Sequence, residues 1–128
     1  MSIDTINTTY IYIVTAATLT PAMSGTTFIC TPRGGGGTAI TLPAVSPGLR
    51  FRFIHSTTVA NAITFAGGAN LMNGLWRQVN GTATPGAGVT SIAFTATAVP
   101  GDTIDLISDG VSWYAIGNTA VAAGIAFA

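Results

Sequence analysis

The sequence predicts an all-β fold, an antiparallel β-sandwich or jelly-roll-like single domain. Short runs of β-branched and aromatic residues recur along the 128 residues, and turn sequences rich in Gly, Pro or Asn separate them. Helical periodicity with capping residues is absent, and the polar helix formers are nearly missing, since the chain has no Lys, no Glu and one Gln. About nine or ten short strands in one chain are typical of a sandwich, jelly roll or small barrel.

Residues 1–39 are expected to provide two N-terminal strands and a Gly-rich connection. The strands are predicted at Asn7–Thr15 and Thr26–Thr31, where β-branched and aromatic residues gather. The connection contains Gly34–Gly37, which lack the Gly-Lys-Ser/Thr ending of a phosphate-binding loop. We therefore interpret this connection as a turn or a flexible link, and residues 1–39 as a candidate anchoring segment.

Residues 40–117 are expected to form the core of the sandwich. The cleanest alternation is in Leu49–His55, where Phe51 and Phe53 share one face, and Arg50 and Arg52 share the other. We expect Asn80–Gly88 to be a loop, because Gly, Pro and Thr dominate it. Strands are predicted at Thr38–Leu42, Leu49–His55, Ala62–Phe65, Leu75–Val79 and Thr90–Ala96.

A β-hairpin is predicted at Pro100–Gly117. Its two arms alternate apolar with polar residues, and Ser108-Asp109-Gly110 supplies the turn. Pro47–Gly68 begins with the same Pro-Gly and apolar spacing, so we interpret the two stretches as one hairpin design used twice. Arg52 and Asp105 occupy matching positions, and would form an ion pair if the hairpins pack on each other or meet across a subunit interface.

Residues 118–128 form a small apolar tail without charge. An exposed tail of this composition would promote aggregation, so we expect it to dock on its own domain or on a neighbour.

Charged residues are very scarce in this chain. Four Arg and four Asp make up 6% of the residues with no net charge, whereas soluble monomers usually keep a charged surface. Either Thr, Ser, Asn and Gly solvate the surface instead, or copies of the chain in a homo-oligomer, or partner proteins, cover much of it. We expect a mixture, with burial in an assembly as the larger part. Four scattered Arg do not make the basic patch that nucleic acid needs, and no apolar run is long enough for a membrane span.

The residues that enzymes use for catalysis are few. The chain has one histidine, His55, and one cysteine. Nothing in the sequence places either of them beside a residue with which it would form a nucleophile–base pair. Asp102, Asp105 and Asp109 form the one acidic cluster, but their spacing does not match a calcium-binding loop. The sequence therefore predicts no enzymatic activity, no cofactor and no metal site.

Three stretches together resemble β-rich domains of bacteriophage and other virion proteins. They are Ile40–Ile54 (ITLPAVSPGLRFRFI), Ala62–Gly68 (AITFAGG) and Gly101–Gly117 (GDTIDLISDGVSWYAIG). In such domains a Leu-Pro turn and a Gly precede an apolar strand, and a hairpin of the Gly-Asp…Ser-Asp-Gly…Trp type closes the domain. The resemblance covers Ile40–Gly117 and leaves Met1–Ala39 outside. It implies a trimeric tail-fibre, spike or capsid-decoration module located in the virion.

Composition and resemblance together favour a structural virion protein. In this hypothesis the chain is a capsid decoration (cement) or minor capsid subunit that stabilises the shell through contacts with the major capsid protein or other virion proteins. The alternative is a receptor-binding tail-fibre or spike module that recognises host surface glycans. Trp76, beside Arg77, is the candidate ligand-facing aromatic residue for that role, whereas Trp113 is expected in the core.

Overall fold

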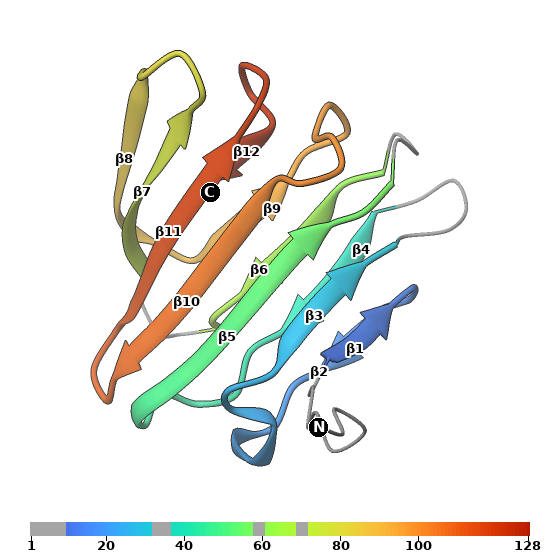
Figure 1. Cartoon of the computed structure of the whole chain (residues 1–128). Helices are drawn as coiled ribbons and strands as arrows, with labels where there is room; N and C mark the ends of the chain where they lie inside the picture. Colours follow the sequence, from blue (N-terminus) through green and yellow to red (C-terminus); the bar gives the residue numbers. More distant parts are fainter. Residues whose placement is uncertain (1–9, 32–36, 58–60, 69–71) are drawn as a thin grey trace, which may run out of the picture.

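Two β-sheets lie face to face in the computed structural model of the chain and enclose its hydrophobic core (Figure 1). The structure describes residues 10–31, 37–57, 61–68 and 72–128. Strands make up nearly all of the regular secondary structure in these residues, and one short 3-10 helix, η1 (Pro21–Met23), is added. The predicted all-β class is confirmed.

The larger sheet has seven strands in the order β1-β3-β5-β10-β11-β7-β8. These strands are β1 (Tyr10–Ile13), β3 (Thr27–Cys30), β5 (Pro47–His55), β10 (Thr103–Asp109), β11 (Trp113–Thr119), β7 (Met72–Gln78) and β8 (Ala83–Val89). The smaller sheet has five strands in the order β12-β9-β6-β4-β2. Its members are β12 (Ile125–Phe127), β9 (Ser91–Phe94), β6 (Ile63–Ala66), β4 (Thr38–Thr41) and β2 (Ala17–Thr18).

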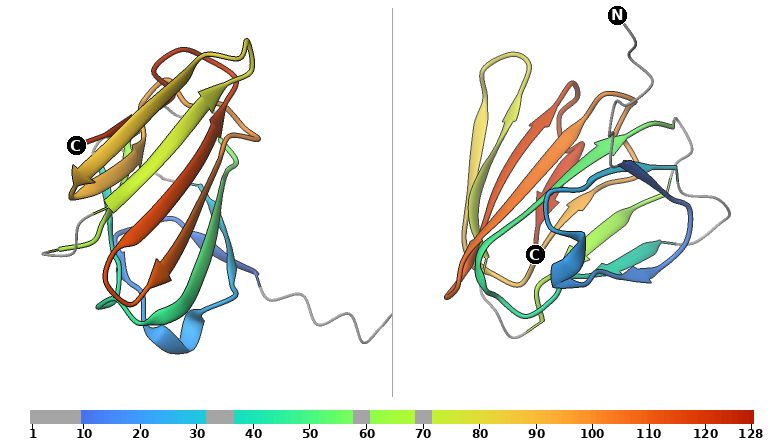
Figure 2. Two further views of the ribbon diagram at one scale, coloured as in Figure 1. Left: turned by 90° about the vertical axis from the view of Figure 1, so that its left-hand side faces the viewer. Right: turned by 60° about the horizontal axis from the view of Figure 1, so that its bottom comes forward.

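The first six strands alternate between the two sheets, so that the chain winds around the core (Figure 2). After each full turn around the core, the chain enters the same sheet again, and the new strand runs in the same direction as the previous strand of that sheet. As a result β1, β3 and β5 pair in parallel in the larger sheet, and β2, β4 and β6 pair in parallel in the smaller one. The expectation of an antiparallel sandwich is therefore wrong in this respect, because both sheets are mixed. Antiparallel pairing begins where β5 meets β10 in the larger sheet and where β6 meets β9 in the smaller one.

One of the two predicted hairpins is present. β10 and β11 pair antiparallel around a turn at which Gly110 has a φ of +94°, a conformation that favours glycine. The earlier stretch is not a hairpin: β5 lies in the larger sheet and β6 in the smaller one. Instead, β5 pairs with β10, with Phe51 opposite Leu106. The shared Pro-Gly pattern therefore marks two neighbouring strands of one sheet.

The core is rich in aromatic side chains that the two sheets contribute in alternation. Phe53 of β5 and Phe65 of β6 lie across the sandwich with ring centroids 4.0 Å apart, and Phe65 packs edge-on against Phe94 at 5.8 Å. Trp113 is fully buried in the same core, as predicted from its place in the hairpin. Burial of each large apolar side chain stabilises the fold by about 2–3 kcal/mol. Because these rings fill the space between the two sheets, they fix the distance between them.

Both ends of the described chain belong to the sandwich. β1 and β3 lie in the same sheet as β5, so these N-terminal strands pack with the strands of residues 40–117. The predicted strand residues 7–9 and most of the Gly-rich connection lie outside the described residues. At the other end the tail docks on its own domain, because β12 pairs with β9 and buries Ile125.

Candidate interaction surface

The outward side of the seven-stranded sheet is the most distinctive surface of the molecule. Successive side chains of a strand point to opposite faces of a sheet. β5 therefore buries Phe51 and Phe53 against the smaller sheet, and presents Arg50, Arg52 and Ile54 on the other side. The same alternation in β11 buries Trp113 and Ala115 and exposes the residues between them.

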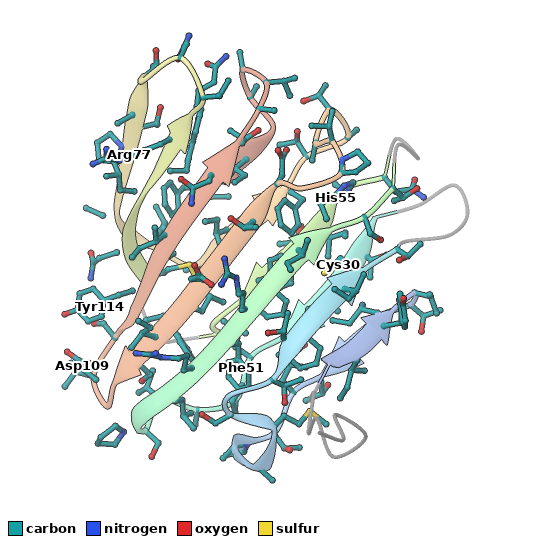
Figure 3. The ribbon with its side chains drawn as sticks, viewed as in Figure 1. Cys30, Phe51, His55, Arg77, Asp109 and Tyr114 are labelled. Atoms are coloured by element: carbon teal, nitrogen blue, oxygen red, sulfur yellow. The ribbon has the colours of Figure 1, made fainter. Side chains whose placement is uncertain are left out.

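We call this surface the outer face. Its side chains come from six strands and form rows across the sheet, because paired residues share a face. They are Tyr12, Thr27, Ile29, Arg50, Arg52, Ile54, Asn73, Leu75, Arg77, Thr103, Asp105, Ile107, Tyr114, Ile116 and Asn118. Figure 3 shows side chains of this sheet, with Arg77 and Tyr114 labelled.

Large apolar groups are strongly exposed on the outer face. The exposed fraction is 62% for Tyr12, 53% for Ile116 and 45% for Tyr114. Tyr114 and Ile116 lie together on β11, whereas Tyr12 lies four strands away on the edge strand β1. Exposed apolar side chains on one face mark candidate binding sites. Sequence reasoning did not single them out, although the alternation in Trp113–Gly117 places Tyr114 and Ile116 opposite the buried Trp113.

Arg52 and Asp105, the predicted pair, lie side by side within one chain. They are directly opposite each other on β5 and β10, and Nε of Arg52 lies 3.5 Å from Oδ1 of Asp105. The side chains are 55% and 34% exposed, respectively. Solvent screens a pair in this position, so the contact orients the guanidinium more than it stabilises the fold.

The distribution of charge gives the outer face a positive character. Arg50, Arg52 and Arg77, all the arginines in the described ranges, lie on it. Two carboxylates lie on or beside it: Asp105 within the sheet, and Asp109 at the tip of the hairpin, where it accepts a hydrogen bond from the hydroxyl of Tyr114, whereas Asp102 is 3% exposed in the interior. The chain as a whole is neutral, but this face is not.

The expectation for Trp76 is corrected by its burial. Trp76 is 8% exposed and belongs to the core, because the C-terminal tail packs beside it. A groove of about 600 Å³ between β8 and β12 is lined in part by Trp76, Ile125 and Phe127. The indole therefore does not present a free ring face of the kind on which a sugar stacks.

His55 and Cys30 lie next to each other in the interior. They are register partners on β5 and β3, and are 1% and 0% exposed (Figure 3). Burial raises the pKa of the Cys30 thiol to about 12, so the nucleophilic thiolate is not formed near neutral pH. Burial also lowers the pKa of His55, against an opposing charge effect of Asp102. The burial and the pKa shifts of Cys30 and His55 are those of packed core side chains.

The three predicted aspartates of the acidic cluster separate into different roles. Asp109 accepts hydrogen bonds at Oδ1 from the backbone N–H groups of Val111 (2.8 Å) and Ser112 (2.9 Å), and closes the hairpin turn. These bonds favour the charged carboxylate and lower its pKa. Within the described residues no three His, Cys, Asp or Glu side chains gather as a metal site would require.

The fold and this surface define the chain as a two-sheet β-sandwich with an apolar, arginine-bearing outer face. Comparison with models of known protein families gives no match. No curated protein matches the sequence. Among the described residues, no helix has the length and apolar character needed to cross a membrane.

Proposed function

We propose that this chain is a structural subunit of a virus particle, a capsid decoration or minor capsid protein. It acts by covering its outer face with other virion subunits, such as the major capsid protein. The observation that carries the proposal is the exposure of Tyr12, Tyr114 and Ile116 on one sheet face. The resemblance of Ile40–Gly117 to virion modules supports the same role and the location in the virion.

The size of the outer face is suitable for a small specific contact. Its six strands, spaced about 4.8 Å apart, span roughly 24 Å, and strands of seven residues add roughly 20 Å. The product, roughly 500 Å², is smaller than the ~800 Å² that each partner contributes to a standard interface. Its exposed apolar side chains, Tyr12, Tyr114 and Ile116, would supply most of the binding free energy at about 25 cal/mol per Å² buried.

A homotrimer is part of the proposal. The chain has 6% charged residues, which is far below the level that keeps monomeric proteins soluble, and self-association removes uncharged surface from water. In this arrangement the trimer is the unit that decorates the particle, and its outer faces meet the shell.

The alternative, a receptor-binding tail-fibre or spike module for host glycans, relies on other residues than the sequence suggested. Trp76 is buried, whereas Tyr12 and Tyr114 expose their side chains. The hydroxyl of Tyr114 donates a hydrogen bond of 3.2 Å to Oδ2 of Asp109. An exposed ring beside a carboxylate is a combination that binds sugars, so this alternative is included in the experiment.

The experiment combines sedimentation of the purified chain with its recovery on particles. An antibody against the chain is used to follow it through a density gradient of virus particles from the source of the sequence. Ile116→Asp places a charge at the centre of the outer face, and Thr41→Asp is the matched control on the outward side of the smaller sheet. We expect a trimer for all three proteins, enrichment with particles for wild type and Thr41→Asp, and loss of particle binding for Ile116→Asp.

Two results would contradict the proposal. Absence of the chain from intact particles overturns the structural role. Particle binding that persists in Ile116→Asp overturns the outer face as the contact surface. A glycan array that binds wild-type protein, and loses the signal on Tyr114→Ala, would instead establish the receptor-binding alternative.

A further inference from the structure

We infer that a hollow on the outer face, at Arg50 and Arg52, receives a carboxylate side chain from an acidic surface of a partner protein. The inference rests on the proposed function, since it names the chemistry of the partner that the outer face contacts. It concerns one place on that face, where the strands β3, β5, β10 and β11 lie side by side.

The hollow has a volume of about 320 Å³. Its walls combine two guanidinium groups with a hydroxyl, a carboxylate and two aliphatic side chains, from Thr27, Arg50, Arg52, Asp105, Ile107 and Ile116. A carboxylate group with its aliphatic stem fits within this volume, and the isoleucines reduce the access of water to it.

The backbone around the hollow is held firmly. Gly25 donates its N–H to the carbonyl of Arg50 at 2.7 Å, and the N–H of Arg50 bonds to the hydroxyl of Ser24 at 3.0 Å. Arg52 donates its N–H to the carbonyl of Thr26 at 3.3 Å. Both arginines therefore leave a fixed strand at alternate positions, on the same side of the sheet. This preorganisation reduces the entropy that binding must overcome.

The arginines retain unused binding capacity. Within the described part of the chain, Arg50 forms no ion pair, and Arg52 has one contact of 3.5 Å to Asp105. A guanidinium offers five N–H donors in a planar fork that matches a carboxylate, and two guanidinium groups at one place carry more positive charge than Asp105 neutralises. An incoming carboxylate completes this arrangement.

Charge also indicates that the occupant is not the outer face of a second copy. Two such faces in contact would bring together six arginines and four aspartates, counted as twice Arg50, Arg52 and Arg77 against twice Asp105 and Asp109, and at the hollow itself four arginines against two aspartates, from Arg50, Arg52 and Asp105 of each copy. Like charges opposed across an interface cost binding free energy and exclude partners. A partner with acidic side chains has the opposite effect. The trimer is then formed through another surface, and the outer face remains for the shell.

A direct test uses a fluorescein-labelled octaglutamate peptide and the full chain, with fluorescence anisotropy at low ionic strength. The double variant Arg50→Gln/Arg52→Gln removes both guanidinium groups of the hollow, and Arg77→Gln is the matched control on the same face. We expect the double variant to weaken binding about tenfold or more, and the control about twofold or less. Asp105→Asn should tighten binding, because it removes the carboxylate that competes for Arg52.

Three outcomes overturn the inference: no binding of the peptide to wild-type protein, equal weakening by Arg77→Gln, or weaker binding by Asp105→Asn. A heparin fragment that binds more tightly than the peptide, with the same dependence on Arg50 and Arg52, would assign the hollow to an anionic glycan instead. The two proposals fail separately. If the chain is absent from particles but the peptide binds as expected, the structural role fails and the carboxylate site stands.

Discussion

The hydroxyl of Thr119 donates a hydrogen bond of 3.0 Å to Oδ2 of Asp102 in the interior of the protein. The same oxygen accepts the backbone N–H of Val99 at 3.1 Å, and Oδ1 accepts the N–H of Ala120 at 2.9 Å. The carboxylate therefore joins the loop that precedes β10 to the turn that follows β11. Asp102 was the first of the three aspartates considered for calcium, and the structure gives it the role of a clamp between two loops.

Replacing Asp102 by Ala should destabilise the protein by about 1–3 kcal/mol, because the part-buried N–H groups of Val99 and Ala120 and the buried hydroxyl of Thr119 lose their acceptor. Thr119→Val removes one of the three bonds to Asp102 together with the contacts of the same hydroxyl to Val121, and should cost about 1–2 kcal/mol. Urea unfolding at neutral pH measures both changes. Asp109→Ala is the control, since its N–H partners are exposed and can bond to water, and its effect should be smaller. Equal losses for Asp102→Ala and Asp109→Ala would contradict the clamp.

His55 makes the stability of the fold sensitive to acid. The ring is 1% exposed, packs edge-on against Phe94 with centroids 5.2 Å apart, and has no hydrogen-bond partner for either nitrogen among the described residues. Cys30 and Asp102 are the titratable groups beside it. Burial lowers the pKa of His55 below its ordinary value of 6.5, and the charge of Asp102 opposes this shift only in part.

The direction of the pH effect follows from this lowered pKa. As the pH falls through about 6.5, the unfolded chain binds a proton at His55 before the folded chain does, so the free energy of unfolding decreases. The contribution of neutral His55 to the free energy of unfolding is fully present above about pH 6.5. It is lost progressively as the pH falls to the pKa of His55 in the folded chain. Denaturant unfolding at about pH 8 and about pH 5 should show the decrease in wild type. His55→Leu should not show it, because this is the only histidine of the chain. A wild-type free energy that does not change with pH would contradict this prediction.

Gly74 marks a place where two strands leave no room for a side chain. It is the register partner of Ala115 on β11, and a Cβ added to it would overlap the carbonyl oxygen of Ala115 and lie 2.9 Å from the carbonyl carbon. These are backbone atoms, so the strands themselves must move. Gly74→Ala should therefore destabilise the protein by about 2–3 kcal/mol.

A matched control for this glycine is Gly37→Ala. The nearest atom to a Cβ at Gly37 is the carbonyl oxygen of Ala62 at 3.7 Å, an ordinary contact. Thermal unfolding of the two variants should show a clear decrease in melting temperature for Gly74→Ala and little change for Gly37→Ala. Equal decreases would mean that an added methyl group is harmful at either glycine, and that the close approach at Ala115 has no special effect.

Alternation in the sequence predicted which residues are buried better than it predicted which strands pair. The burial pattern of Leu49–His55 and the core position of Trp113 follow from residue type and period alone. The parallel winding of β1 to β6 does not, because alternation identifies the buried face of a strand without identifying its sheet or its neighbour. For this reason the predicted hairpin at Pro47–Gly68 was wrong.

Three strands, β2 (Ala17–Thr18), β8 and β12, were not predicted, and β8 was missed because its sequence contains breakers of regular structure. β8 (Ala83–Val89) carries Pro85 and Gly86, and its place at the edge of the sheet tolerates a residue without an N–H. The ring of Phe127 lies where a Cβ of Gly86 would be, so this glycine is needed for long-range packing. β12 was predicted only as a docking tail. Contacts between residues so far apart in the chain leave no local signal.

Arg52 and Asp105 allow a test of whether the contact acts within one chain. Nε of Arg52 and Oδ1 of Asp105 are 3.5 Å apart on adjacent strands of the same sheet. A double-mutant cycle with Arg52→Ala and Asp105→Ala should give a coupling energy of about 0.2–1 kcal/mol, as is typical of exposed ion pairs. The coupling should decrease with added salt and should not depend on protein concentration. Chemical denaturation at two concentrations, each at low and high salt, measures these properties.

The control cycle pairs Arg77→Ala with Asp105→Ala. Arg77 lies on β7, two strands away from β10, so its coupling with Asp105 should be close to zero. A coupling of Arg52 with Asp105 that grows with protein concentration would mean that the pair joins different subunits, as the sequence also allowed. In that case Arg52 would contribute to assembly, and the hollow at Arg50 and Arg52 would be occupied by another copy of the chain. Concentration-independent coupling keeps the pair within one chain and the hollow available to a partner carboxylate.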